Sequence, residues 1–514
     1  MGIRKRYVQQ FFILLTSLSM IWAITTSIIS PRIGAIFSLF RDTYSYKITI
    51  IVNVICLIFS LVLYLGVFFL LKKLKGQELN NKVTYVVLLF ELLIYFIAVL
   101  LFVKYIGFSN PVDDTRITLR NLQDLQAGKE WGYNYMYSNP QNLLLMYLFW
   151  GIQQLFGTSY QAIIVVFTIM HLFTILLLFL SLKNLKISNL SSLIAVQVMI
   201  FAIQIAFHVP VAYTDILSLF FTALTFYFMT NYLAVPQEKM GIKLLFLSLA
   251  LVACTIGFIS KGTVLILVIA IALFLGIVNQ KQWKLLCLFP FIFLFLGNFG
   301  WKQVINSQEL FPDTNYGQPN THYLMMGLNS TPIPDDLPED QHYRWMVGAY
   351  SSSDQEFTWS MFLKEKLPKK EVEEKNLQVV KERLSNLSML QILQVLNNKV
   401  SVSWSSGDLK SSFEVFLGTG RDESKMHLFK SKSTGLILYS VMMTIQYIVY
   451  LGIILAGIKF FKKENDFILL CTIYISGYFA FLLIWEASPR YAMGIFIPAI
   501  LMIGLLLERK QLTK

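Results

Sequence analysis

Apolar runs of about 20 residues recur along most of the chain and are separated by mostly short polar segments. A helix needs about 20 consecutive apolar residues to cross a bilayer, so the pattern predicts about twelve transmembrane helices. We expect them at 8–29, 48–71, 83–103, 160–182, 190–207, 216–233, 244–260, 263–278, 285–301, 436–458, 467–485 and 492–507. The predicted fold class is therefore an all-α polytopic membrane protein.

Two polar segments are longer than the others, at 104–159 and 302–433. The first contains "TRITLRNLQDLQAG", a predicted helix, and "NPQNLLLMYLFWGIQQLFG", whose amphipathic pattern predicts a helix lying in the membrane interface. The second is rich in charge and is large enough for a small subdomain, in which "KKEVEEKNLQVVKERLSNLSMLQILQVL" has helical spacing. We therefore expect N-terminal helices (1–82), a transmembrane core (83–301), the subdomain (302–433) and C-terminal helices (434–514).

The basic residues indicate on which side of the membrane each loop lies. The formal net charge is +13, and Lys and Arg concentrate in the short loops that a cytoplasmic N-terminus places inside. This pattern predicts a cell-membrane protein with both termini in the cytoplasm, both long segments on the extracytoplasmic face and no nucleic-acid partner. The first apolar run is too long for a signal peptide, so we expect a retained span. The four cysteines lie in apolar runs and predict no disulfide framework.

Asp113 and Asp114 stand side by side shortly after the predicted span 83–103. Pro111 precedes them, and proline ends a helix, so the pair is expected at the outer membrane surface. A carboxylate at that position is a candidate general base for chemistry on a lipid-carried substrate. In the alternative, the pair caps the following helix by accepting its free amide protons.

Polar residues on the same predicted face mark two further clusters. Asp215 opens the span 216–233, where a helix cap is a sufficient explanation, and His208 precedes it as a candidate metal ligand or an interfacial side chain. Lys261 and Gly262 form a tight turn on the outer side, against the preference of cations for the inside. A lone cation there suits a lipid phosphate, and ordinary snorkelling to a headgroup is the alternative.

The last outer turn, "WEASPRYAMG", carries Glu486, Arg490 and Tyr491. The planar guanidinium of Arg suits phosphate, and Tyr can hydrogen-bond or stack on a sugar. Mutual neutralisation of Glu486 and Arg490 is the alternative. Glu91 lies within the span 83–103 and needs a partner that the sequence does not name.

These motifs, in this order, resemble the C superfamily of glycosyltransferases (GT-C), and most closely the branch with protein O-mannosyltransferases and bacterial aminoarabinose transferases. The acidic pair with Ile117, Leu125 and Gly128 is similar to that branch's first-loop motif. "SNPQNLLLMYLF" is similar to the segment after it, with Asn139 in place of a frequent Lys. "YTDILSLFFTALTFYF", "GFISKGTVLILVIAIAL" and "PRYAMGIFIPAILMIGLLL" are similar to its Asp-containing span, its Lys-Gly-Pro turn (with Thr263 in place of Pro) and its late Arg-Tyr-Pro span.

The resemblance implies a membrane glycosyltransferase that moves a sugar from a polyprenyl-phosphate donor to a hydroxyl of an extracytoplasmic acceptor, such as an envelope polysaccharide, teichoic acid, lipid or protein. It places the catalytic base at Asp113, with Asp114 second, and a single displacement predicts inversion at the anomeric carbon. The residues assigned to the donor phosphate or sugar are Lys261, Arg490, Tyr491, Asp215, His208 and Tyr137. The segment 302–433 matches no motif of the family, so the acceptor stays open.

Two other functional classes are compatible with the sequence. About twelve spans is also a common count for a transporter or flippase of lipid-linked sugars, although the unequal loops and the lack of an internal repeat argue against one. A noncatalytic protein of envelope-polymer assembly, binding a partner through 302–433, is the third class. No motif requires a cofactor, and a divalent metal is an open alternative without an identified ligand set.

Overall fold

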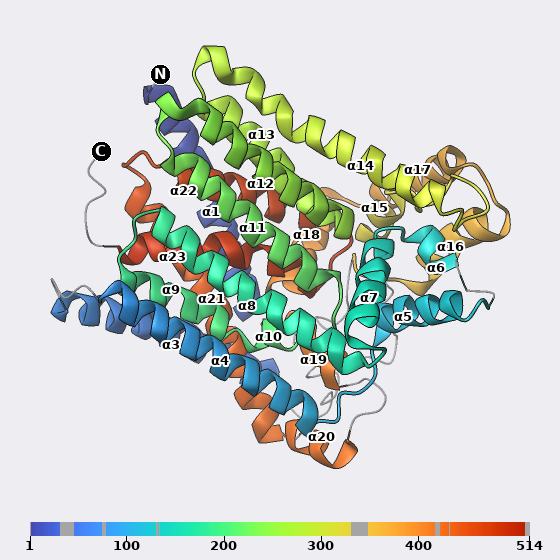
Figure 1. The fold of residues 1–514 in the computed structure, drawn as a ribbon, viewed down its shortest axis with the longest axis horizontal. Helices are drawn as coiled ribbons and strands as arrows, with labels where there is room; N and C mark the ends of the chain where they lie inside the picture. The colour runs from blue at the N-terminus through green and yellow to red at the C-terminus, as the bar shows by residue number, and fades with distance from the viewer. Residues whose placement is uncertain are drawn as a thin grey trace.

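The computed structural model describes residues 2–30, 46–74, 79–129, 132, 134–329, 348–416, 422–430 and 432–508. These parts are helical, with no strand among them. The long helices run side by side, and α1 begins and α23 ends at the same end of the bundle (Figure 1). We call the opposite end the distal end, and the all-α class is confirmed.

Ten helices within the described residues are long and apolar enough to cross a membrane. They lie on α1 (Gly2–Ile29), α3 (Tyr46–Lys73), α4 (Asn81–Tyr105), α8 (Tyr160–Asn184), α11 (Thr214–Ala234), α12 (Met240–Ser260), α14 (Phe289–Ser307), α21 (Lys432–Phe460), α22 (Asp466–Ile484) and α23 (Phe496–Leu507). Two predicted spans correspond to the shorter apolar helices α9 (Asn189–Ile200) and α13 (Leu265–Val278). The count of twelve is thus not confirmed: α9 stops and restarts as the short α10 (Ile203–Ala206), and a 3₁₀ turn, η2 (Gly262–Val264), precedes α13.

Polar residues within the bundle find partners on neighbouring helices. The Gln197 side chain on α9 donates to the Glu91 carboxylate on α4 at 2.9 Å, which gives Glu91 the partner that the sequence left unnamed. Thr16 of α1 and Ser476 of α22 share a hydrogen bond of 2.6 Å. Such contacts satisfy groups that hydrocarbon cannot.

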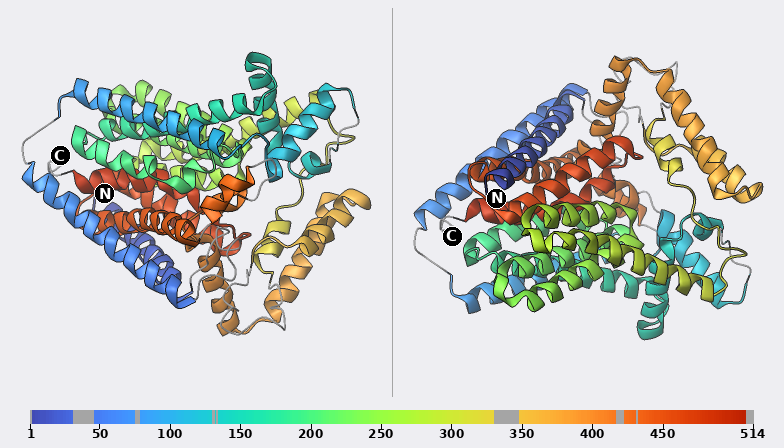
Figure 2. Two further views of the ribbon diagram at one scale, coloured as in Figure 1. Left: turned by 90° about the horizontal axis from the view of Figure 1, so that it is seen from below. Right: turned by 90° about the horizontal axis from the view of Figure 1, so that it is seen from above.

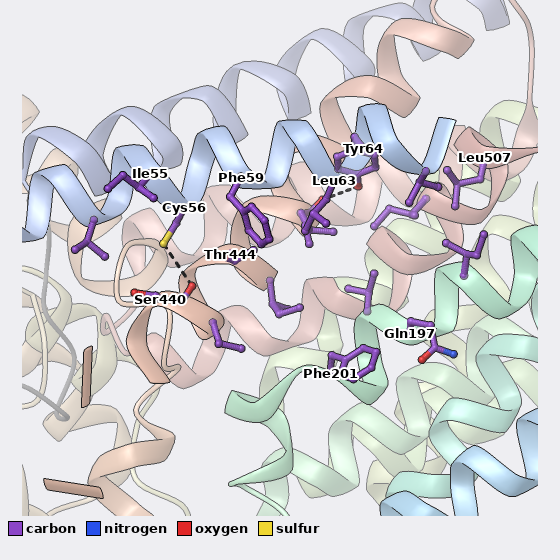
Figure 3. Close-up of a pocket in the computed structure, with 18 residues that line it drawn as sticks. Ile55, Cys56, Phe59, Leu63, Tyr64, Gln197, Phe201, Ser440, Thr444 and Leu507 are labelled. Atoms are coloured by element: carbon purple, nitrogen blue, oxygen red, sulfur yellow. Dashed lines mark hydrogen bonds between the residues drawn. The ribbon is translucent and has the colours of Figure 1, made fainter. Parts of the chain in front are cut away.

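An apolar groove of about 620 Å³ lies between α3, α9, α21 and α23 (Figure 3). Three of its polar lining groups already have partners: Tyr64 donates to the Ile448 carbonyl at 2.7 Å, Cys56 donates to the Ser440 carbonyl at 3.4 Å, and Gln197 donates to the Glu91 carboxylate. The groove therefore presents hydrocarbon, and none of the predicted site residues lines it.

The distal end is covered by helices from both long segments, as Figures 1 and 2 show. The first segment folds as α5 (Asp113–Gln126), α6 (Asn134–Ser138) and α7 (Asn142–Phe156), in agreement with the two predicted helices. The second contributes α15 (Thr321–Gly327), α16 (Ser352–Trp359) with the π-helical turn η5 (Ser360–Lys364), α17 (Lys369–Ser385), α18 (Met389–Trp404), α19 (Ser411–Phe416) and α20 (Glu423–Lys430).

The segment predicted as helical within 302–433 is two helices and not one. The helix is interrupted before Ser388, because the Ser388 side chain caps the start of α18 and exchanges hydrogen bonds with Gln391 in a capping box. The break lets α18 run back toward the bundle, where it packs against α1, α22 and the turn before α23.

Candidate active site

Lys261 and Asp215 form a buried ion pair at the distal end of the bundle. Asp215 lies in the first turn of α11, and Lys261 ends α12 in an extended conformation with φ −157°. Burial lowers the pKa of Lys261, with Arg490 acting in the same direction and the Asp215 carboxylate opposing it. The helix-cap alternative for Asp215 is thus incomplete, because its carboxylate also holds a cation.

Arg490 lies beside this pair, in the 3₁₀ turn η6 (Pro489–Ile495) that leads into α23. Its guanidinium is 3.6 Å from the Asp114 carboxylate and 3.4 Å from the Glu414 carboxylate. The ring of Tyr213 lies 5.3 Å from the guanidinium carbon, within cation–π range. Its Nε is buried and has no hydrogen-bond partner among the described residues.

The structure separates the two members of the acidic pair. Both lie in the first turn of α5, where Asp114 is half-buried and turned toward Arg490. Asp113 is exposed, and its φ of 42° lies in the left-handed region that residues other than glycine seldom adopt. The structure therefore brings Asp114, and not Asp113, into contact with Arg490.

Glu414 also belongs to this cluster, although the sequence did not reveal it. It lies on α19, is 3% exposed, and faces Arg490, Lys410 at 3.8 Å and His208 at 3.9 Å. Burial lowers the pKa of His208, so its imidazole is neutral at neutral pH and the contact with Glu414 is not an ion pair. His208 instead shares a hydrogen bond of 2.9 Å with the Leu409 carbonyl.

The remaining predicted residues fall into two groups. Tyr491 belongs to the cluster, because its ring lies 5.3 Å from the Lys261 amine and its hydroxyl donates to Glu486 at 3.5 Å. Burial raises the pKa of Glu486, with Arg490 opposing the shift. Tyr137 lies in a separate apolar cluster and donates to the Asp313 carboxylate at 2.7 Å.

Within the described residues, no group of three or more His, Cys, Asp or Glu side chains is arranged to hold a metal ion. The carboxylates of the cluster contact cationic side chains instead. The arrangement offers two buried cations and one accessible carboxylate, which suits binding of an anion next to a proton acceptor.

We expect Glu414→Gln to lower the free energy of unfolding by about 3 kcal/mol, because breaking a buried ion pair leaves an uncompensated charge. Chemical unfolding in detergent micelles measures the change. Glu371→Gln is the matched control: Glu371 forms an exposed pair with Lys375 at 3.3 Å, and we expect a change within about 0.5 kcal/mol. Equal effects of the two substitutions would contradict the buried role of Glu414.

Comparison with known proteins adds an independent observation. The family model described as dolichyl-phosphate-mannose-protein mannosyltransferase matches residues 139–301. Two crystal structures of ArnT from Cupriavidus metallidurans are similar to the chain. The apo form has 12% identity and a TM-score of 0.36 over 81% of this chain and 77% of that one. The form bound to undecaprenyl phosphate has 11% identity and a TM-score of 0.32 over 83% and 78%.

No curated protein gives a significant sequence match to the chain. The family match begins at the segment after the acidic pair and includes Asp215 and Lys261. It thereby contains two members of the charged cluster. The match confirms the resemblance to the GT-C superfamily of glycosyltransferases that the sequence motifs predicted.

Proposed function

We propose that the protein transfers a sugar from a polyprenyl-phosphate donor to a hydroxyl acceptor on the extracytoplasmic side of the membrane. The observation that carries the proposal is the contact of Arg490 with Asp114, beside the buried Lys261–Asp215 pair. It joins a cationic site for the donor phosphate to a carboxylate for the acceptor proton. The family match, to a model described by a polyprenyl-phosphate sugar, supports this donor class.

Lys261 and Arg490 are suited to the phosphate of the donor. Both are buried beneath aromatic rings, where charge-assisted hydrogen bonds are stronger than in water. The unpartnered Nε of Arg490 leaves part of its planar donor set unused, which favours an additional anionic partner. We assign the group attached to that phosphate to Tyr491, because its ring lies 5.3 Å from the Lys261 amine.

The acidic pair is proposed to supply the base. The family motif places this role on Asp113, whereas the contacts favour Asp114, because only Asp114 of the two lies at the cationic residues. The acceptor oxygen attacks C1 of the sugar and passes its proton to the carboxylate. The bond from C1 to the phosphate oxygen breaks, and polyprenyl phosphate leaves with the bonding electrons. A single displacement inverts the anomeric carbon.

The test is transfer by the purified protein in lipid nanodiscs from synthetic polyprenyl-phosphate sugars that differ in the sugar. Hydroxyl acceptors extracted from the cell envelope are supplied, and mass spectrometry detects the product. We expect one sugar to be transferred with inverted anomeric configuration and polyprenyl phosphate to be released in equal amount. Movement of the donor across vesicles without any transfer would instead support a transporter.

A further inference from the structure

Lys399 lies on α18, in the segment that matches no motif of the family, yet its amine contacts the turn that carries Arg490. The side chain is 1% exposed. Its Nζ donates to the Gly327 carbonyl at the end of α15 and to the Trp485 carbonyl after α22, both at 2.6 Å. One amine thus joins the 302–433 segment to the turn 485–491.

Two glycines leave room for this amine. A Cβ on Gly327 would come within 2.9 Å of Nζ, and a Cβ on Gly348 within 2.6 Å of the Gly327 carbonyl and 3.1 Å of Nζ. Gly348 also has φ +74°, which a side chain would strain. The close approach therefore depends on both glycines.

Two further contacts join the turn 485–491 to the 302–433 segment. The Ala487 amide donates to the Gly348 carbonyl at 2.6 Å. The ring of Tyr323, on α15, stacks on Trp485 with centroids 5.0 Å apart. We call the contacts of Lys399, Gly327, Gly348, Trp485 and Ala487 the clasp.

The clasp holds the turn that carries Glu486, Arg490 and Tyr491. We propose that Lys399 is a positioning residue, which fixes this turn so that the Arg490 guanidinium stays in place for the donor phosphate. The inference rests on the proposed function for its catalytic consequence. The clasp itself is a matter of structure and can be tested without the donor.

The two carbonyl acceptors match the two N–H groups of a neutral amine. Burial lowers the pKa of Lys399 to about 7, and the Glu486 carboxylate opposes this shift as the one titratable group of the described residues that acts on it. When the turn is released and water reaches the amine, its pKa returns toward the ordinary value of 10.5. The released state therefore binds a proton more readily than the closed state, so the clasp weakens as pH falls from 10.5 to about 7 and is constant below.

Hydrogen exchange of the peptide 485–491 tests the clasp. In the wild type, exchange corrected for its intrinsic rate should slow as pH rises from 7 to 9, by up to about tenfold per pH unit. Lys399→Met removes both hydrogen bonds, and Lys399→Arg keeps a charge at every pH, so both variants should exchange faster and show no such trend. Lys375→Met, at an exposed lysine of α17, is the control and should match the wild type.

Binding of undecaprenyl phosphate to the same proteins tests the consequence. We expect a dissociation constant about 2- to 10-fold higher in Lys399→Met, the range that loss of a hydrogen bond produces, with Lys375→Met unchanged. The ionisation of the free ligand is the same in every experiment, so a difference in dissociation constant between two proteins reflects the substitution. Gly348→Ala crowds the amine without altering Lys399 and serves as a second variant in case Lys399→Met folds poorly. It should also give faster exchange of 485–491 and a higher dissociation constant.

The outcomes separate the two proposals. Equal exchange of 485–491 in the wild type and in both the Lys399→Met and Gly348→Ala variants would overturn the clasp. Faster exchange with unchanged ligand affinity would overturn the positioning role and leave a purely structural one. A wild-type protein that binds no polyprenyl phosphate would instead remove the proposed function, while the exchange data still decide the clasp.

Discussion

Asp114→Asn should lower the rate of sugar transfer by about 10²- to 10⁴-fold, the usual contribution of a positioned general base. The substitution preserves the shape of the side chain and removes its ability to accept a proton. Asp113→Asn is the matched control on the neighbouring residue and should stay within a few-fold of wild type, because Asp113 is exposed and faces none of the cations. Turnover with saturating donor in nanodiscs is the measurement.

The opposite result is as informative. If Asp113→Asn loses activity and Asp114→Asn keeps it, the base is the residue to which the family motif assigns the role, and Asp114 serves to hold Arg490. Equal small effects at both positions would remove the acidic pair from the reaction.

Lys261→Met should abolish detectable donor binding and also weaken folding. The substitution removes a cation from the phosphate site and leaves the Asp215 carboxylate buried without its partner, which typically costs about 3–5 kcal/mol. The double variant Lys261→Met with Asp215→Asn removes both charges together. We expect it to regain most of the lost stability and none of the lost transfer activity.

Thermal unfolding and binding of undecaprenyl phosphate, measured on both proteins, separate the two effects. If the double variant regains transfer together with stability, Lys261 has only a structural role. If it binds the ligand with wild-type affinity, the phosphate site does not include Lys261.

The sequence alone placed Asp215, Lys261 and Arg490 on one side of the membrane. Charged residues that interrupt apolar runs are few, and the order of the spans assigns each of them to a membrane face. The same reasoning could not separate Asp113 from Asp114. Adjacent residues of a helix point in directions about 100° apart, and only the packing of α5 decides which of the two faces Arg490.

Glu414 escaped prediction for a different reason. The 302–433 segment contains many charged residues, so one more carboxylate gave no signal. Its immediate surroundings did differ, since Glu414 lies between Phe413 and Val415 in a stretch of low charge, as a buried acid would. Two of its partners, Arg490 and His208, come from other parts of the fold, and only the packing of α19 on the bundle brings them together.

Helix lengths show the same limit. Hydropathy locates apolar segments well, but it does not report where a helix breaks within one. The 190–207 segment is interrupted after Ile200, and the helical segment of the second loop is broken by the cap at Ser388. The break at Ser388 depends on a side-chain hydrogen bond that competes with a continuous helix, whereas no side-chain cap accompanies the restart after Ile200.

The pairing of charges at the site also bears on product release in the proposed reaction. Lys261, Lys410 and Arg490 each have a carboxylate partner among Asp114, Asp215 and Glu414. In the proposed reaction the donor phosphate displaces some of these carboxylates on entering, and they return when the phosphate leaves. Because polyprenyl phosphate gains negative charge when the sugar is transferred, a site of unpaired cations would retain the product most tightly. Carboxylates that pair again with the cations weaken the binding of this product and so favour release of polyprenyl phosphate.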